Sequence, residues 1–157
     1  MIRTGLGFDA HAFDAAGSLV LGGVAIPDAP GLAGHSDADA LSHAIADALL
    51  GAAGLGDLGE RFPASDEWKN ASSLDIVREC ASIARAAGWS ISNVDATIVA
   101  ERPRLAPYRD HMIENLARAL DITTDRVSVK ATTTDGMGFT GRGEGIGVLA
   151  IVTISAD

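Results

Sequence analysis

The last apolar segment of the chain, IGVLAIVTI at residues 146–154, constrains the fold more than any other feature. Side chains of a β-strand alternate between its two faces, so Val148 and Val152 point one way while Leu149 and Ile151 point the other. Both faces of this predicted strand are therefore mostly apolar. A sheet built around it needs cover on both sides, because large apolar patches are rarely left in water.

Strand-like and helix-like segments alternate along the rest of the 157 residues, which favours an α/β or α+β layered fold. This length suits one domain with a sizeable core, and we expect a single domain over 1–157. The expected strands are 2–13, two short strands in 18–26 around a Gly22-Gly23 turn, 90–101, 126–134 and 146–154; the expected helices are 37–54, 72–88 and 107–121; and the expected loops are 27–34, 56–70 and 135–145.

These helices can cover one face of a single mixed sheet, and few elements are left to cover the other. A neighbouring subunit is the simplest cover for that second face, so we expect a homo-oligomer. The net charge is −9 and Lys and Arg do not cluster, which argues against a nucleic-acid partner. A small phosphorylated ligand remains compatible with this charge, because backbone N–H groups and a metal can bind phosphate.

Neither an apolar run of 18 residues nor a signal-peptide pattern occurs in the sequence, so we expect no membrane span and a cytoplasmic location. The single cysteine, Cys80, lies in a helical pattern and is expected to be a small core residue.

Three residues form a candidate metal site. Asp9 and His11 are two apart on a predicted strand and so share one face, while His43 lies in a predicted helix otherwise filled by Ala, Leu and Ile. Two imidazoles and one carboxylate suit a divalent cation such as zinc, and three protein ligands leave a position for water or substrate. The alternative is a chance Asp-x-His pair and a histidine satisfied within the core.

Two aspartates share a helix face with His43, at four-residue steps before and after it. Asp39 and Asp47 could orient the histidine from behind, or could simply cap the helix and face solvent. Ser36 followed by Asp39 also resembles a capping box, which would start the helix near residue 37.

A second cluster, KATTTDGMGFTGRGEG at 130–145, runs from a predicted strand into a glycine-rich loop. Its hydroxyls and free N–H groups suit a phosphate, and Asp135 could hold a second, harder cation such as magnesium. A strand followed by a flexible turn explains the same pattern, and Arg142 with Glu144 would then be a surface ion pair.

Four segments together resemble the 2-C-methyl-D-erythritol 2,4-cyclodiphosphate synthase family, in order and over nearly the whole chain. They are GFDAHAF, GHSDADALSHAIADALLGAAGLGDLGERFPASD, NVDATIVAERPRLAP and KATTTDGMGFTGRGEGIG. The resemblance implies an α+β domain whose mixed sheet has helices on one face and packs by its other face in a homotrimer, with active sites between subunits. It also implies that an isoprenoid diphosphate can occupy the central cavity.

The resemblance assigns roles to individual residues. It implies that Asp9, His11 and His43 bind Zn²⁺, that Asp135 holds Mg²⁺ or Mn²⁺ at the diphosphate, and that His35 and Thr133 stabilise the transition state. The substrate-binding residues that it implies are Ser36, Asp57, Leu58, Gly59, Phe62, Pro63, Ala64, Ser65, Asp66, Ala100, Glu101, Arg102, Pro103, Arg104, Leu105, Ala106, Pro107, Thr132, Thr134, Phe139 and Arg142.

The implied reaction is an intramolecular attack of the 2-phosphate of 4-diphosphocytidyl-2-C-methyl-D-erythritol 2-phosphate on the β-phosphorus, with release of CMP. The chain departs from the family pattern at Asp135, where glutamate is usual, and at Arg104, where lysine is usual. Two alternatives to this function are a metal-dependent phosphohydrolase and a non-catalytic trimeric module that binds isoprenoid diphosphates.

Overall fold

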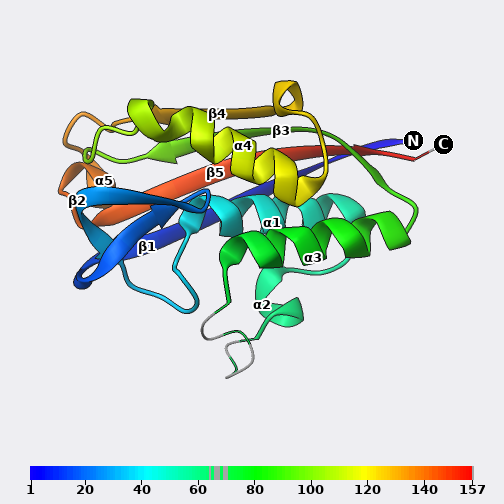
Figure 1. The fold of residues 1–157 in the computed structure, drawn as a ribbon, viewed down its shortest axis with the longest axis horizontal. Helices are drawn as coiled ribbons and strands as arrows, with labels where there is room; N and C mark the ends of the chain where they lie inside the picture. The colour runs from blue at the N-terminus through cyan, green and yellow to red at the C-terminus, as the bar shows by residue number, and fades with distance from the viewer. Residues whose placement is uncertain (64, 66–67, 69–70, 157) are drawn as a thin grey trace.

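A computed structural model describes residues 1–63, 65, 68 and 71–156, and its strands form one mixed sheet (Figure 1). The strand order is β2-β1-β5-β3-β4, in which β3 and β4 run parallel and the other neighbours pair antiparallel. The predicted mixed sheet is confirmed. The strands are β1 (Ile2–Leu21), β2 (Val24–Leu32), β3 (Ser90–Val99), β4 (Val127–Thr132) and β5 (Gly145–Ser155).

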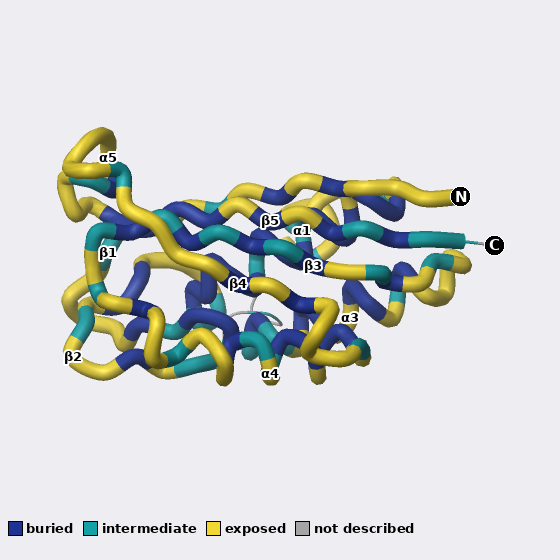
Figure 2. Tube along the Cα trace, turned by 90° about the horizontal axis from the view of Figure 1, so that it is seen from above, coloured by how far each residue is buried: buried dark blue, intermediate teal, exposed yellow. Residues whose placement is uncertain are grey.

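Three longer helices pack against one face of this sheet, namely α1 (Ala40–Ala53), α3 (Ser73–Ala86) and α4 (Arg109–Leu120) (Figures 1 and 2). Short helical segments connect the larger elements, and two of them interrupt stretches for which we expected loops. They are α2 (Leu58–Arg61), η1 (Ala106–Tyr108), η2 (Thr124–Arg126) and α5 (Gly138–Gly141). The loop prediction missed α2 because its start depends on a local cap, in which the Asp57 carboxylate accepts the Glu60 N–H at 2.8 Å.

The strand β1 lies unusually close to the helix α1. A Cβ atom added at Gly5 would lie 2.0 Å from the carbonyl oxygen of Ala48, and one added at Gly7 would lie 2.0 Å from that of Ala44. Only glycine on the strand, facing alanine on the helix, allows the two backbones to approach this far. This contact brings the side chains that follow Gly7 within reach of the start of α1.

The hairpin of β1 and β2 differs from the expected pattern of two short strands and a loop. The turn at Gly22-Gly23 is confirmed, and both glycines have positive φ angles, as a tight hairpin turn requires. The loop expected at 27–34 is wrong, because β2 continues to Leu32 and pairs it with Phe13. Its prolines are tolerated because β2 is an edge strand, and bulges between Asp14 and Leu19 adjust the register.

The start of α1 also differs from the prediction. Asp39, not Ser36, is the N-cap, and its carboxylate accepts the N–H of Ser42 at 3.0 Å. Ser36 and Ala38 have φ angles of 58° and 51°, in the left-handed region, so the chain turns sharply before the helix begins. Such angles are uncommon for residues with a Cβ, which is why a pattern of polar residues predicted the start too early.

The two faces of β5 have different surroundings, as the alternation of its side chains predicts. Val148 and Val152 are buried beneath the helices, whereas Leu149 and Ile151 are 41% and 43% exposed on the opposite face. Leu6 and Phe8 of the neighbouring β1 are also exposed there. Figure 2 shows α3 and α4 as a layer on one side of the strands only. Among the described helices, none combines the length and apolar character needed to cross a bilayer.

Candidate metal centre

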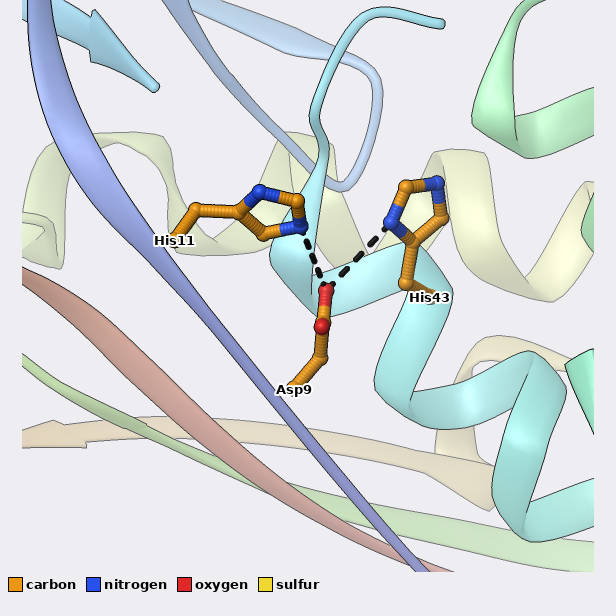
Figure 3. A group of neighbouring side chains, drawn as sticks. All are labelled: Asp9, His11 and His43. Carbon is orange, nitrogen blue, oxygen red and sulfur yellow. Dashed lines mark hydrogen bonds and ion pairs between the residues drawn. The ribbon is translucent and has the colours of Figure 1, made fainter. Parts of the chain in front are cut away.

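The candidate metal centre lies between β1 and the first turn of α1 (Figure 3). Asp9 and His11 pair with Val148 and Ile146 of β5, whose side chains point towards the helices, so both project to the same side. His43 is the fourth residue of α1 and faces them. The prediction that these three side chains converge is confirmed.

One carboxylate oxygen lies between the two imidazoles. Oδ2 of Asp9 is 2.8 Å from Nε2 of His11 and 3.3 Å from Nδ1 of His43. One ligand atom from each of the three residues lies within 4.8 Å of the other two. The side chains are partly buried, with exposed fractions of 26%, 15% and 12% for Asp9, His11 and His43. A cation placed among them would still be reachable from solvent.

The ionisation of Asp9 favours a cation. Burial alone would raise the pKa of Asp9, but its contacts with the imidazoles of His11 and His43 outweigh the effect of burial and hold that pKa well below its ordinary value. The hydrogen bond to Asp9 raises the pKa of His11, against the opposing effect of burial. Asp9 is therefore a carboxylate at neutral pH, which is the form that binds metal.

The outer nitrogen of each imidazole also has a partner. Nδ1 of His11 lies 2.6 Å from the carbonyl oxygen of Ala33, and Nε2 of His43 lies 2.9 Å from Oγ of Ser73. A histidine that donates one ring N–H to such an acceptor presents the lone pair of its other nitrogen to a metal. The donor set and its outer contacts therefore fit a divalent cation.

A cavity of about 330 Å³ opens beside this group. His35, Ser36 and the segment around Phe62 line it, and a neighbouring cavity of about 270 Å³ borders Asp9 and Asp57. The predicted residues found in these two cavities are His35, Ser36, Asp57, Leu58, Gly59, Phe62, Pro63 and Ser65. The predicted Ala64 and Asp66 lie outside the described residues.

Residues 131–133 of the second predicted cluster line a different cavity, of about 420 Å³, together with the predicted substrate-binding residues 100–106. Pro107 follows in η1, outside that lining. No described residue lines both this cavity and the cavity at the metal centre. Asp135, within the described part of the chain, does not join the Asp-His-His group.

The loop after β4 is held by a residue that we expected to contact substrate. The carboxylate of Glu101 accepts the N–H groups of Thr134 and Gly136 at 3.0 and 3.3 Å. Asp135, between them, has a φ of 53°. This network holds the threonine-rich turn against the start of the segment that follows β3.

The remaining predicted residues, Phe139 and Arg142, lie just before the start of β5. Phe139 is 40% exposed beside the apolar face of the sheet. The guanidinium of Arg142 donates to Glu144 at 2.7 Å, and both side chains are exposed, as in the surface ion pair that was one of the two alternatives. Arg142 also borders a cavity of about 560 Å³ beside Phe13.

The carboxylates of the two aspartates that share a face with His43 bind other groups. Asp39 caps α1 and accepts the N–H groups of the Gly22-Gly23 turn, while Asp47 accepts the N–H of Leu58 at 3.0 Å. The residues behind His43 are instead Ser73 and, beyond it, Asp37. Sequence reasoning missed both roles, since Ser73 lies 30 residues from His43 and nothing in the local pattern links them.

The sheet, its helical layer and the converging group define the chain as an α/β protein with a site suited to a divalent cation. The model of the YgbB family matches residues 2–155, and the chain belongs to this family. Two curated relatives are named 2-C-methyl-D-erythritol 2,4-cyclodiphosphate synthase, which confirms the resemblance noted from the sequence.

The relative from Syntrophomonas wolfei is 54% identical over 98% of this chain and 98% of its own length. The one from Moorella thermoacetica is 55% identical over 98% of this chain and 94% of its own length. A solved structure described as 2C-methyl-D-erythritol-2,4-cyclodiphosphate synthase, bound form CDP, has a TM-score of 0.89 and 32% identity. It covers 98% of this chain and 100% of its own.

Proposed function

We propose that the chain cyclises 4-diphosphocytidyl-2-C-methyl-D-erythritol 2-phosphate to the 2,4-cyclodiphosphate and CMP. An oxygen of the 2-phosphate attacks the β-phosphorus, the bond from that phosphorus to the CMP oxygen breaks, and CMP leaves. The convergence of Asp9, His11 and His43 beside a cavity carries this proposal, together with the names of relatives that match almost the whole chain. The nucleophile belongs to the substrate, so the protein need not supply one.

The proposal includes the metals. Asp9, His11 and His43 would hold Zn²⁺, because imidazole and carboxylate ligands suit that ion, and Asp135 would help to hold Mg²⁺ or Mn²⁺. When bound, these cations supply Lewis-acid stabilisation of charge on the phosphoryl oxygens. This part of the function requires Asp9 as a carboxylate, which its contacts favour, and unprotonated metal-facing nitrogens on His11 and His43.

The task left to the protein is to fold a flexible polyanion so that the attacking oxygen lies in line with the β-phosphorus. We assign His35 and Thr133 to stabilising charge in the transition state, and Ser36 with residues 57–59 and 62–66 to the phosphate and erythritol region. Residues 100–107 would enclose the cytosine and ribose, and Thr132, Thr134 and Asp135 the diphosphate. Phe139 and Arg142 would lie near the substrate or the subunit axis.

We further propose a homotrimer with active sites between subunits. The exposed apolar face around Phe8 and Ile151 needs a cover, and a second copy of the chain supplies one. The metal cavity and the cavity at residues 100–106 have no lining residue in common, so one substrate would reach both if they came from neighbouring subunits. We also propose that an isoprenoid diphosphate can occupy the central cavity of the trimer. Residues 1–157 would form a single domain, and the protein would be cytoplasmic.

Phosphorus NMR of the product tests the function directly. Cyclisation predicts two coupled phosphorus resonances from the product, together with CMP and without inorganic phosphate. A phosphohydrolase would instead release inorganic phosphate or an open-chain product, and a binding module would leave the substrate unchanged. Either of those spectra would refute the proposed reaction.

A further inference from the structure

A buried hydroxyl faces the side of His43 that points away from Asp9. Ser73, the first residue of α3, is fully buried, and its Oγ lies 2.9 Å from Nε2 of His43. The same hydroxyl is hydrogen-bonded to one carboxylate oxygen of Asp37, and the other oxygen of Asp37 accepts the N–H of Ser73 at 3.1 Å. The side chains of Asp37, Ser73 and His43 are thus linked in that order by hydrogen bonds.

The chemistry of these groups fixes the direction of the hydrogen bonds. An ionised carboxylate only accepts, so the hydroxyl proton of Ser73 points to Asp37. The oxygen of Ser73 then presents a lone pair to His43, which must carry its proton on Nε2 to donate to it. In that tautomer Nδ1 of His43, 3.3 Å from Oδ2 of Asp9, has a free lone pair on the side of the candidate metal centre.

We propose that Asp37 and Ser73 are positioning residues that hold His43 in its metal-binding tautomer and ring orientation. The inference depends on the proposed metal site but goes beyond it, because neither residue belongs to the Asp-His-His group. His11 receives equivalent support from the main chain at Ala33, whereas the closest contact at Nε2 of His43 is a side chain that a substitution can remove.

Neighbouring serines show that position, not residue type, gives Ser73 this role. Oγ of Ser36 lies 3.4 Å from the same nitrogen and 3.2 Å from Oγ of Ser73, so it is the more distant partner. Ser72 precedes Ser73 at the start of α3 and makes no capping bond with its side chain. Ser72→Ala is therefore a matched control, with the same chemical change one residue away.

Metal affinity measured by chelator competition with Zn²⁺ tests the proposal on the full-length protein. Ser73→Ala should weaken Zn²⁺ binding about 10- to 100-fold, the usual effect of losing such an outer contact, whereas Ser72→Ala should leave it unchanged. The Co²⁺-substituted Ser73→Ala protein should show a shifted visible absorption spectrum, because the imidazole is no longer held in one orientation. An unaltered affinity together with an unaltered spectrum would overturn the proposal.

Asp37→Asn provides a second variant that keeps the side-chain volume. An amide offers one acceptor oxygen and an NH₂ donor, so one of the two bonds from Ser73 is lost or reversed and the hydroxyl proton is free to turn towards His43. Asp37→Asn should weaken Zn²⁺ binding in the wild-type background and add no further loss to Ser73→Ala. Fully additive losses would contradict a single chain of contacts.

Two-dimensional ¹H–¹⁵N NMR of the metal-free protein, at a pH where its imidazoles are neutral, tests the tautomer itself. The share of the Nε2–H tautomer of His43 should be larger in the wild type than in Ser73→Ala, because only the wild type has the Ser73 acceptor to compete with the Asp9 carboxylate for the imidazole proton. An equal share of that tautomer in the two proteins would refute the inference. If the wild type binds no divalent cation, the proposed function fails; if it binds one and Ser73→Ala binds it equally well, only this inference fails.

Discussion

The close contact between β1 and α1 predicts a large effect for Gly7→Ala. The new Cβ would lie 2.0 Å from the carbonyl oxygen of Ala44 and 2.7 Å from the backbone nitrogen of Ala48. Both partners are main-chain atoms of a helix, so no side-chain rotation relieves the overlap. The strand and the helix would have to separate by about 1 Å before the contact became tolerable.

The cost follows from this geometry. Overpacking a well-packed core costs about 1–3 kcal/mol, and two overlaps with backbone atoms place Gly7→Ala at the upper end, at about 3 kcal/mol. For a chain of this size, such a loss lowers the melting temperature by about 6–12 °C. Because Ala44 follows His43 and Gly7 precedes Asp9 by two residues, the same separation should lengthen the 3.3 Å contact between His43 and Asp9 and weaken metal binding.

Thermal unfolding followed by circular dichroism, together with chelator competition, measures both effects. Gly51→Ala is the matched control, because a Cβ there meets no atom within 4 Å and alanine favours a helix by about 1 kcal/mol over glycine. The control should therefore melt slightly above the wild type. If Gly7→Ala melted at or above the wild type with full metal affinity, the proposed role of this close contact would be wrong.

Three further predictions follow from buried or networked polar groups. Asp39→Ala leaves four buried or partly buried donors without their acceptor, so it should lower the free energy of unfolding by at least about 3 kcal/mol in urea titrations. Asp47→Ala removes one such bond and should cost about 1 kcal/mol. Equal losses for the two variants would contradict this prediction. Burial raises the pKa of the Cys80 thiol to about 12, so this thiol stays protonated at pH 8. It should therefore react with a disulfide reagent only after the protein is denatured. Rapid labelling of the native protein would contradict this prediction. Glu101→Gln weakens the acceptor of the Thr134 N–H and should speed hydrogen exchange at that amide about tenfold. Unchanged protection of the Thr134 amide would show that this contact does not order the loop after β4.

The sequence predicts the elements that depend on periodicity. Alternation along a strand is enough to place Asp9 and His11 on one face, and it also separates the buried Val148 from the exposed Leu149. The apolar helix around His43 has to face the sheet, so the third member of the group follows from the same reasoning. These predictions succeed because each depends on a local repeat that the fold preserves.

The features that the sequence did not predict depend on contacts between distant segments or on unusual backbone angles. Ser73 stands behind His43 only because α3 packs beside α1, and no spacing rule connects them. The left-handed Ser36 and Ala38 delay the start of α1, and serine and alanine, unlike glycine, asparagine or aspartate, carry no sequence signal for such angles. The extension of β2 through two prolines likewise depends on its place at the sheet edge.

Metal stoichiometry of the wild type and of His43→Ala tests the central claim most directly. After dialysis against Zn²⁺ and removal of the excess, the wild type should retain one tightly bound ion per Asp-His-His group. His43→Ala should retain none at that site while its far-ultraviolet circular dichroism stays that of the folded protein. A folded His43→Ala protein that holds the ion as tightly as the wild type would contradict the account.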